Sequence, residues 1–210
     1  MFHVEQQAWT PEAFQHAFDV PRGTMQQLAR YAELLEEWQR KMNLVGPATL
    51  PDLWGRHFAD SAQLLRHAPG CNKWLDIGSG GGFPGMLLAI LGVEQVILVE
   101  SIAKKARFLQ ALRDELGLQQ QVSVLPQRIE QLPSLQVDVA TARAVASLDR
   151  LLDWSLPHVR PGGLWLFPKG RSWEEEAGEA RKRFSFDLSV LPSMTDAEAR
   201  ILRVCKLKRR

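Results

Sequence analysis

The segment from Trp74 to Gly85, WLDIGSGGGFPG, constrains the fold more than any other part of the chain. A short apolar run ends at Ile77, and five of the next eight residues are glycine. A short strand that ends in a glycine-rich turn before a helix is typical of a βαβ unit, and the bare main chain lets a ligand approach closely. The segment therefore predicts an α/β fold with a ligand at the carboxyl end of this strand.

Strand and helix patterns alternate after Gly70. The apolar runs that predict strands span residues 73–77, 95–100, 122–125, 137–141 and 164–168. The helical patterns between them span residues 84–91, 103–116 and 148–159. Such alternation predicts a parallel sheet with helices on both faces.

The last part of the chain has a different pattern. A charged helix is predicted at 173–183, followed by strands at 186–191 and 201–207. About ten residues separate these two strands, too few for a parallel crossover. We predict one sheet of about seven strands in which the last strand is antiparallel.

Residues 1–70 are predicted to be helical. Thr10, Pro11 and Glu12 resemble an N-cap, an N1 proline and a first-turn acid. Apolar residues recur at spacings of three and four between Thr24 and Met42, and a third helix is expected at 51–67. We expect a helical extension, residues 1–70, packed on a Rossmann-like domain of residues 71–210, the two forming one structural unit.

Composition limits the class of protein only broadly. Hydrophobic residues make up 45% and charged residues 24%, which suits a globular core, and a net charge of +2 permits a nucleic-acid partner without requiring one. The two cysteines, Cys71 and Cys205, lie far apart, so we predict neither a disulfide nor a metal site. Residues 1–14 lack a targeting pattern, and the longest apolar run, Met86 to Leu91, is too short to cross a bilayer. A cytoplasmic protein without a membrane partner is expected.

Three ligands are candidates for the glycine loop. A P-loop would end in Gly-Lys-Ser or Gly-Lys-Thr, which this loop does not. A dinucleotide motif is formally present as Gly80-x-Gly82-x-x-Gly85, with Glu100 following 20 residues after Gly80. The turn, however, begins at Gly78, directly after Asp76-Ile77, and a carboxylate there would repel a pyrophosphate. The Asp76 carboxylate suits instead the ammonium and sulfonium of S-adenosylmethionine. An NAD-dependent oxidoreductase stays as an alternative function.

Each part of the loop has a predicted role. Asp76 would accept from the cofactor's ammonium, directly or through water, and Gly78, Gly80 and Gly82 would admit its methionine portion. Glu100 would accept from both ribose hydroxyls, a role shared with NAD sites. The helix, Pro-Gly-Gly turn and strand over residues 156–166 are similar to a segment of class I methyltransferases. A class I S-adenosylmethionine-dependent methyltransferase fold is therefore predicted.

Four short segments carry a pattern more specific than the glycine loop alone. They are Trp38…Met42-Asn43-Leu44, Arg56-His57-x-x-Asp60-Ser61, Asp76-Ile-Gly-Ser-Gly-Gly-Gly-Phe-Pro-Gly85, and Ser101…Lys104-Lys105-x-Arg107-Phe108-Leu109. Together they resemble the glucose-inhibited division protein B family, the small-subunit ribosomal RNA guanine-N7 methyltransferases. Family members often have threonine where this chain has Val45, so no hydroxyl role is assigned there.

The resemblance implies methyl transfer from S-adenosylmethionine to N7 of a guanine in 16S ribosomal RNA. It also implies cofactor contacts from Gly78, Phe83, Ile129, Glu130 and Arg143. His57, Asp60 and Ser61, at spacings of three and four, would share one helix face and, with Arg143, position the substrate. None of them is assigned as an acid or a base.

Basic residues mark the candidate RNA surface. The candidates are Arg56, Lys104, Lys105, Arg107, Lys169 and Arg171. Because the net charge is modest, we expect weak binding to naked RNA and better recognition of a small-subunit ribosomal particle by a monomeric enzyme. The alternatives are a methyltransferase acting on another RNA, a protein or a small molecule, and a non-catalytic RNA-binding assembly factor.

Overall fold

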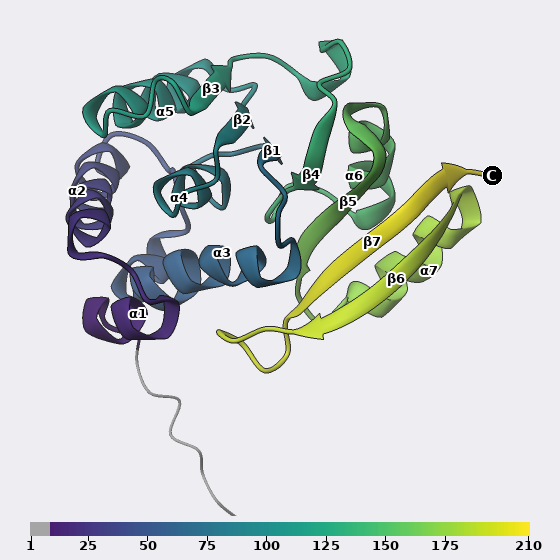
Figure 1. Cartoon of the computed structure of the whole chain (residues 1–210), viewed down its shortest axis with the longest axis horizontal. Helices are drawn as coiled ribbons and strands as arrows, with labels where there is room; N and C mark the ends of the chain where they lie inside the picture. The colour runs from purple at the N-terminus through teal and green to yellow at the C-terminus, as the bar shows by residue number, and fades with distance from the viewer. Residues whose placement is uncertain (1–8) are drawn as a thin grey trace, which may run out of the picture.

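The computed structural model describes residues 9–210, which form a seven-stranded sheet with helices on both faces (Figure 1). Residues 1–8 lie outside the described residues, and they belong to the N-terminal segment that was predicted to lack a targeting pattern. The strand order is β3-β2-β1-β4-β5-β7-β6. The strands are β1 (Lys73–Ile77), β2 (Gln95–Val99), β3 (Val122–Leu125), β4 (Val137–Thr141), β5 (Val159–Lys169), β6 (Phe184–Pro192) and β7 (Arg200–Arg209).

The last strand is the one that runs against the others. Strands β1 to β5 pair in parallel, whereas β7 is antiparallel to both of its neighbours, β5 and β6. The predicted sheet, about seven strands with the last reversed, is confirmed. Because β1, β4 and β5 are parallel and adjacent, their carboxyl ends meet at one edge, where ligands of open α/β sheets bind.

Helices account for most of the remaining residues. The α-helices are α1 (Pro11–Phe18), α2 (Arg22–Gln39), α3 (Asp60–Ala62), α4 (Gly85–Ile90), α5 (Ala103–Glu115), α6 (Leu148–Ser155) and α7 (Trp173–Arg183). Five further helical turns are η1 (Pro47–Asp52), η2 (Trp54–Ala59), η3 (Gln63–His67), η4 (Ile129–Gln131) and η5 (Leu156–His158). The predicted cap of α1 is confirmed, since the Thr10 hydroxyl accepts from the Ala13 amide at 3.1 Å.

Two apolar layers hold the sheet. One layer joins α1, α2 and the residues around α3 to α4 and α5, and includes the fully buried Phe14, Leu28 and Tyr31. Trp38 of α2 packs on Phe108 of α5 with ring centroids 5.6 Å apart. The other layer lies under α6 and α7, which Figure 1 draws on the right beside β5, β6 and β7. The N-terminal helices therefore share a core with the sheet.

Three predicted elements differ in detail from the structure. The single helix expected at 51–67 is a succession of η1, η2, α3 and η3, in which η2 is a π-helix: the Asp60 amide donates to the Gly55 carbonyl, five residues earlier. The helix expected at 148–159 ends as α6 at Ser155. Strand β5 begins at Val159 rather than Leu164, because Val159 pairs with Val137 of β4. A register shift between Val137 and Val139 then accommodates the Pro-Gly-Gly turn.

Within residues 9–210, no helix is both long and apolar enough to cross a membrane.

Candidate cofactor and substrate cleft

A cleft of about 1170 Å³ opens at the carboxyl ends of β1, β4 and β5. Its floor and walls come from the glycine loop after β1, the segment after β4 and the turn after β5. Residues of η1, η2 and the β6–β7 loop line it as well. The cleft thus combines parts of the chain that are up to 155 residues apart, from Leu44 to Ala199.

Asp76, the next-to-last residue of β1, is a fully buried carboxylate. Its Oδ2 accepts from the Gly85 amide at 3.0 Å, whereas its Oδ1 has no hydrogen-bond partner among the described residues. Burial raises the pKa of Asp76 to about 7, against the opposing effect of the Gly85 amide. Thr141, its register partner on β4, also has a buried hydroxyl without a partner there. Two buried oxygens next to the glycine loop therefore lack hydrogen-bond partners. A cationic ligand bound there would supply the missing interaction.

The glycine loop is shaped by close approaches to neighbouring side chains. Gly78 has a φ of +69°, and a Cβ there would lie 2.7 Å from Val145. A Cβ on Gly82 would lie 2.4 Å from the Tyr31 hydroxyl, and one on Gly85 would lie 2.3 Å from Leu98. Gly82 and Gly85 are thus required by packing inside the protein.

Tyr31 connects the N-terminal helices to this loop, a role that its apolar spacing in the sequence did not predict. Its hydroxyl donates to the Gly81 carbonyl at 2.6 Å. Its ring stacks on Phe83 at 5.1 Å with an interplanar angle of 15°. Because Tyr31 is fully buried, this hydrogen bond holds the glycine loop against helix α2.

We expect Tyr31→Phe to weaken S-adenosylhomocysteine binding several-fold and to lower the free energy of unfolding by about 1–3 kcal/mol, because the Gly81 carbonyl loses its partner. Calorimetric titration and chemical denaturation measure the two effects. Phe18→Leu, far from the loop, is the control: it should lower stability without changing cofactor affinity. Unchanged affinity in Tyr31→Phe would contradict the role given to the hydroxyl.

Glu100 and two exposed apolar side chains form the wall next to the loop. Glu100 Oε2 accepts from the Gly80 amide at 2.9 Å, and its Oε1 accepts from the Ile102 amide at 2.8 Å. Each oxygen keeps a further lone pair for a hydroxyl. Ile102 and Val145 line the cleft with 51% and 39% of their surface exposed. A carboxylate flanked by apolar side chains suits a ribose and an adenine ring.

Arg143, after β4, is enclosed by the Arg56–Ser61 segment. Its Nη1 donates to the Arg56 carbonyl at 2.6 Å and lies 3.3 Å from Asp60 Oδ2. Its Nη2 lies 2.5 Å from His57 Nδ1, and its guanidinium sits over the Phe83 ring at 5.2 Å. The structure therefore brings together the predicted Arg143, His57, Asp60 and Phe83.

His57 is a neutral spacer in this cluster. Burial, together with the charges of Arg143 and Arg56, lowers the pKa of His57 to about 3. Because an arginine can only donate, Nδ1 must accept from Arg143, so the proton is on Nε2. Nε2 then donates to the Thr49 hydroxyl at 2.7 Å, and that hydroxyl donates to the Gly46 carbonyl. Ser61 lies outside this chain of bonds, since its hydroxyl donates to the His57 carbonyl.

The loop between β6 and β7 supplies a wall that the sequence did not predict. The Thr195 hydroxyl donates to Asp60 Oδ1 at 2.9 Å. The Met194 amide donates to the side-chain carbonyl of Gln63 at 2.8 Å. These bonds tie the C-terminal hairpin to the segment around Arg143, and no sequence motif marks the loop.

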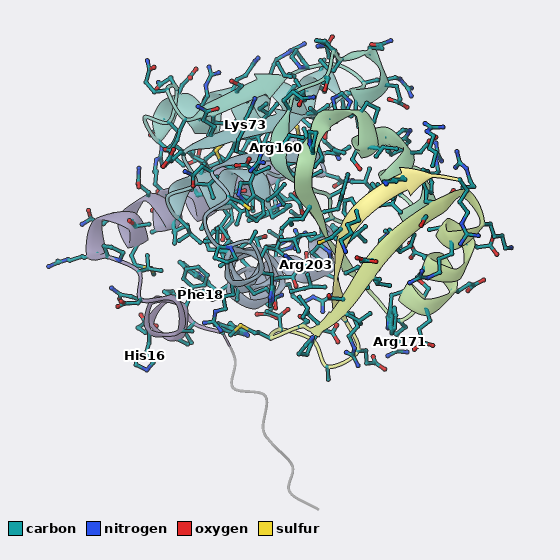
Figure 2. All side chains as sticks on the ribbon, turned by 45° about the vertical axis from the view of Figure 1, so that its right-hand side comes forward. His16, Phe18, Lys73, Arg160, Arg171 and Arg203 are labelled. Atoms are coloured by element: carbon teal, nitrogen blue, oxygen red, sulfur yellow. The ribbon has the colours of Figure 1, made fainter. Side chains whose placement is uncertain are left out.

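The predicted RNA-contacting residues fall into two groups. The side chains of Arg56, Lys169 and Arg171, on the side of the cleft near η2, β5 and α7, each pair with an acid. The ion pairs are Arg56 with Asp196 at 3.1 Å, Lys169 with Glu176 at 2.7 Å, and Arg171 with Glu198. Lys104, Lys105 and Arg107 start α5 on the other side, and Lys105 lines the cleft. Figure 2 shows Arg171 far from Lys73 and Arg160, which mark the opposite edge of the sheet.

Four of the predicted cofactor residues are not among those that line the cleft: Asp76 and Gly82, which are both buried, and Ile129 and Glu130. Ile129 is buried in the layer under α6, and Glu130 is exposed beside it in η4. Their contact with adenine stays a prediction.

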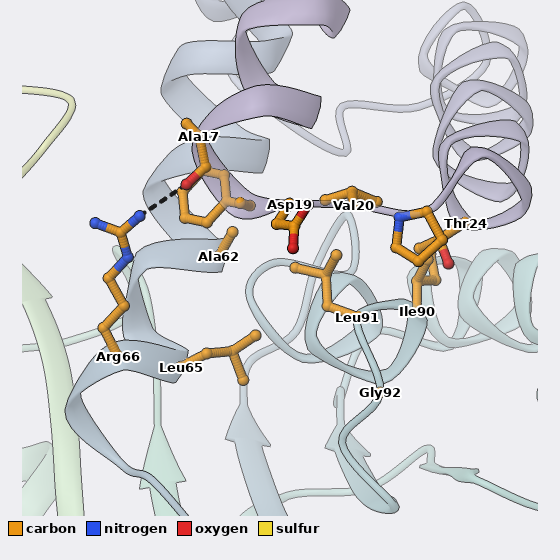
Figure 3. A pocket seen from close by; sticks show the side chains of 12 residues that line it. Ala17, Asp19, Val20, Thr24, Ala62, Leu65, Arg66, Ile90, Leu91 and Gly92 are labelled. Carbon is orange, nitrogen blue, oxygen red and sulfur yellow. Dashed lines mark hydrogen bonds between the residues drawn. The ribbon is translucent and has the colours of Figure 1, made fainter.

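A second cavity, of about 580 Å³, lies at the other end of α4, between α1, the start of α2 and η3 (Figure 3). Its walls are mostly apolar, with Asp19 and Arg66 at the border. Arg66 donates to the Ala17 carbonyl at 2.9 Å, the bond drawn in Figure 3, and lies over the Phe18 ring. None of the site residues predicted from the sequence lines this cavity.

The residues that line the cleft, together with the buried Asp76 just before its glycine loop, fit S-adenosylmethionine. The unpartnered Asp76 oxygen can meet an ammonium group, Glu100 can meet paired hydroxyls, and Ile102 with Val145 can cover an adenine ring. The fold agrees with solved structures. An O-methyltransferase from Bacillus cereus in complex with SAH has a TM-score of 0.59 at 18% identity and covers 96% of this chain and 100% of its own. The cofactor-bound Rv0187 from MTB has a TM-score of 0.61 at 15% identity and covers 93% and 97%.

The fold and the cleft together define a class I S-adenosylmethionine-dependent methyltransferase. The family model for rRNA small subunit methyltransferase G, GidB, matches residues 24–203. A protein named Ribosomal RNA small subunit methyltransferase G from Paramagnetospirillum magneticum is 44% identical over 200 residues, 95% of this chain and 97% of its own. One from Methylobacterium nodulans is 46% identical over 195 residues, 90% and 91%. The chain belongs to the rRNA small subunit methyltransferase G family, which confirms the predicted resemblance and the predicted methyltransferase class.

Proposed function

We propose that this protein transfers a methyl group from S-adenosylmethionine to N7 of a guanine in 16S ribosomal RNA. One observation carries the proposal: the Arg56–Ser61 segment closes around Arg143 in the same cleft as Glu100 and the glycine loop that follows Asp76. A binding place for the cofactor is therefore next to an arginine held by a segment typical of this family. Monomeric action in the cytoplasm is part of the proposal.

The chemistry requires orientation rather than proton transfer. Guanine N7 already carries a lone pair at neutral pH, so it forms the new N–C bond without losing a proton, and the electron pair of the broken S–C bond remains on sulfur. The bound cofactor supplies the activated methyl group. The task of the chain is to hold N7 about 3 Å from that methyl group and in line with the breaking bond. His57 suits this role as a neutral spacer and is unsuited to be a base, because its pKa is about 3.

Arg143 is the residue that the geometry favours for meeting the base. Only 17% of its side chain is exposed, and Asp60 and the His57 ring fix its guanidinium. Arginine donates readily to guanine O6, an acceptor on the same base edge as N7. For N7 methylation, Arg143 would approach from the O6 side and leave N7 free for the methyl group.

Mass spectrometry of small-subunit ribosomal RNA tests the proposal directly. RNA from cells with and without the gene should differ by one 7-methylguanosine, and the purified protein should restore it from labelled S-adenosylmethionine. Loss of a different modification, or of none, would contradict the proposed target. Label transfer to another RNA, a protein or a small molecule would favour the broader methyltransferase alternatives.

The form of the substrate is part of the same proposal. With a net charge of +2, the protein should bind naked 16S RNA weakly and methylate small-subunit particles more efficiently. The ratio of kcat/KM for the two substrates measures this preference. Equal values would show that protein-free RNA is sufficient.

A further inference from the structure

The two sides of the cleft differ in whether their cations are neutralised. On the side formed by η2, the end of β5 and the β6–β7 loop, Arg56, Lys169 and Arg171 each have an acidic partner. Glu175 lines the same side of the cleft. Lys169 also donates to the Ala146 carbonyl, and only 10% of its side chain is exposed. A phosphate on this side would have to displace carboxylates that already hold the cations.

The opposite side carries cations without such partners. Arg40 and Lys41 directly follow α2, and the start of α5 provides Lys104, Lys105 and Arg107. Within residues 9–210, none of these five side chains has an ion pair or a hydrogen bond. We call these five residues the α2–α5 basic strip.

Three acids of the same two helices are occupied elsewhere. Glu33 and Glu37 of α2 and Glu115 at the end of α5 all surround Arg30, at 2.9, 3.9 and 2.9 Å. This arrangement removes three carboxylates from competition for the strip.

The two parts of the strip belong to segments that pack together, and both segments reach the cleft. Trp38 of α2 packs on Phe108 of α5, one turn from Lys104 and Lys105, and Figure 1 draws the two helices side by side at the left. Leu44, three residues beyond Lys41, and Lys105 both line the cleft. A strand of RNA lying along α2 and α5 would therefore arrive at the cleft mouth.

Helix stability does not account for the position of these charges. Cations in the first turn of a helix are unfavourable, because the amino end already carries partial positive charge. The first turn of α5 has Lys104 and Lys105, no acid and no side-chain cap. Cations kept at such a place indicate an anionic partner.

We propose that the α2–α5 basic strip binds the sugar-phosphate backbone of the substrate RNA, and that the acid-paired side of the cleft does not. The inference rests on the proposed function and specifies which face the RNA follows. Phosphate contacts of this kind position an RNA without reading its sequence. The target base would then enter the cleft from the α5 side toward Arg143.

A charge-matched pair of triple variants tests the proposal. The strip variant carries Lys41→Gln, Lys104→Gln and Arg107→Gln, all exposed and outside the cleft lining. The control carries Lys206→Gln, Lys208→Gln and Arg210→Gln, which remove the same charge at the end of β7 and just beyond it, where Lys206 makes one exposed ion pair with Asp187. Both are measured for 16S RNA binding against salt concentration, for kcat and KM with small-subunit particles, and for S-adenosylhomocysteine affinity and thermal unfolding.

The strip variant should bind 16S RNA at least about tenfold more weakly at low salt, with a slope of log K against log salt reduced by about 2. Its KM for particles should rise, while kcat, cofactor affinity and unfolding stay as in the wild type. The control should match the wild type throughout. Equal losses in both variants, or none in the strip variant, would overturn the inference and leave the proposed function standing. A strip variant that loses particle binding but binds 16S RNA normally would point to a ribosomal protein instead, and a wild type that methylates no ribosomal RNA would overturn the proposed function itself.

Discussion

Asp76→Asn is expected to weaken the binding of S-adenosylmethionine about 100-fold while making the cofactor-free protein more stable. The wild-type carboxylate is fully buried, has one unpartnered oxygen and lies in a place where burial raises its pKa to about 7. An asparagine can keep the hydrogen bond from the Gly85 amide and carries no charge to bury. It cannot pair with an ammonium group, and a charged hydrogen bond of this kind is worth about 1.5–3 kcal/mol.

The stability gain should depend on pH in a defined direction. The folded-state pKa of Asp76 lies above its ordinary value of 3.8, so between about pH 4 and pH 7 the unfolded chain has lost a proton that the folded chain keeps. The free energy of unfolding of the wild type therefore falls as pH rises through this window and levels off above about 7. Asp76→Asn should lack this slope, so its advantage of about 1–3 kcal/mol should be present at pH 8 and absent near pH 4.

Chemical denaturation at several pH values and calorimetric titration measure both parts of this prediction. Glu179→Gln, an exposed carboxylate on α7, is the control and should change neither quantity. Normal cofactor affinity in Asp76→Asn would remove Asp76 from the cofactor site, whereas lost affinity without the stability gain would mean that the buried charge is compensated in the free protein.

The sequence was sufficient to predict those features of the structure that a local pattern determines. The glycine loop follows a buried strand because the apolar run from Trp74 stops at Ile77, and Asp76 lies near the carboxyl end of that strand as expected. The reversal of β7 followed from the short connection after β6, since a hairpin is the geometry that so few residues allow. His57, Asp60 and Arg143 could be grouped only through the family resemblance, because 86 residues separate His57 from Arg143.

What the sequence could not predict depends on contacts between distant segments. Tyr31 has the spacing of an ordinary core residue, and only the folded chain places its hydroxyl under Gly81. Thr195 lies in a polar loop without a motif, 135 residues from Asp60, to which it donates. Lys169 was predicted at the cleft rim, where it does lie, but its pairing with Glu176 on the following helix needed the structure. The π-helical turn of η2 likewise carries no signal of its own in the sequence.

Arg143→Lys should lower kcat for methyl transfer by about 100-fold while changing S-adenosylhomocysteine affinity less than tenfold. The charge is retained, but an ammonium cannot satisfy the Arg56 carbonyl, His57 Nδ1 and Asp60 at once, as the guanidinium does. His57 would then lose the donor that fixes its tautomer, and the Arg56–Ser61 segment would no longer be held at a defined distance from Phe83. An error of about 1 Å in a site that works by orientation costs about 100-fold in rate.

Two comparisons make this prediction specific to the cleft. Arg160→Lys changes an arginine that pairs with Asp138 at the opposite edge of the sheet, and it should leave kcat and cofactor affinity unchanged. Thr195→Val removes the bond to Asp60 and should lower kcat in the same direction as Arg143→Lys but by a smaller factor, because Gln63 still donates to the same carboxylate oxygen. Single-turnover rates with small-subunit particles separate the chemical step from product release. If Arg143→Lys raised KM for the cofactor and left kcat intact, the arginine would belong to the cofactor site, and a different residue would have to orient the guanine.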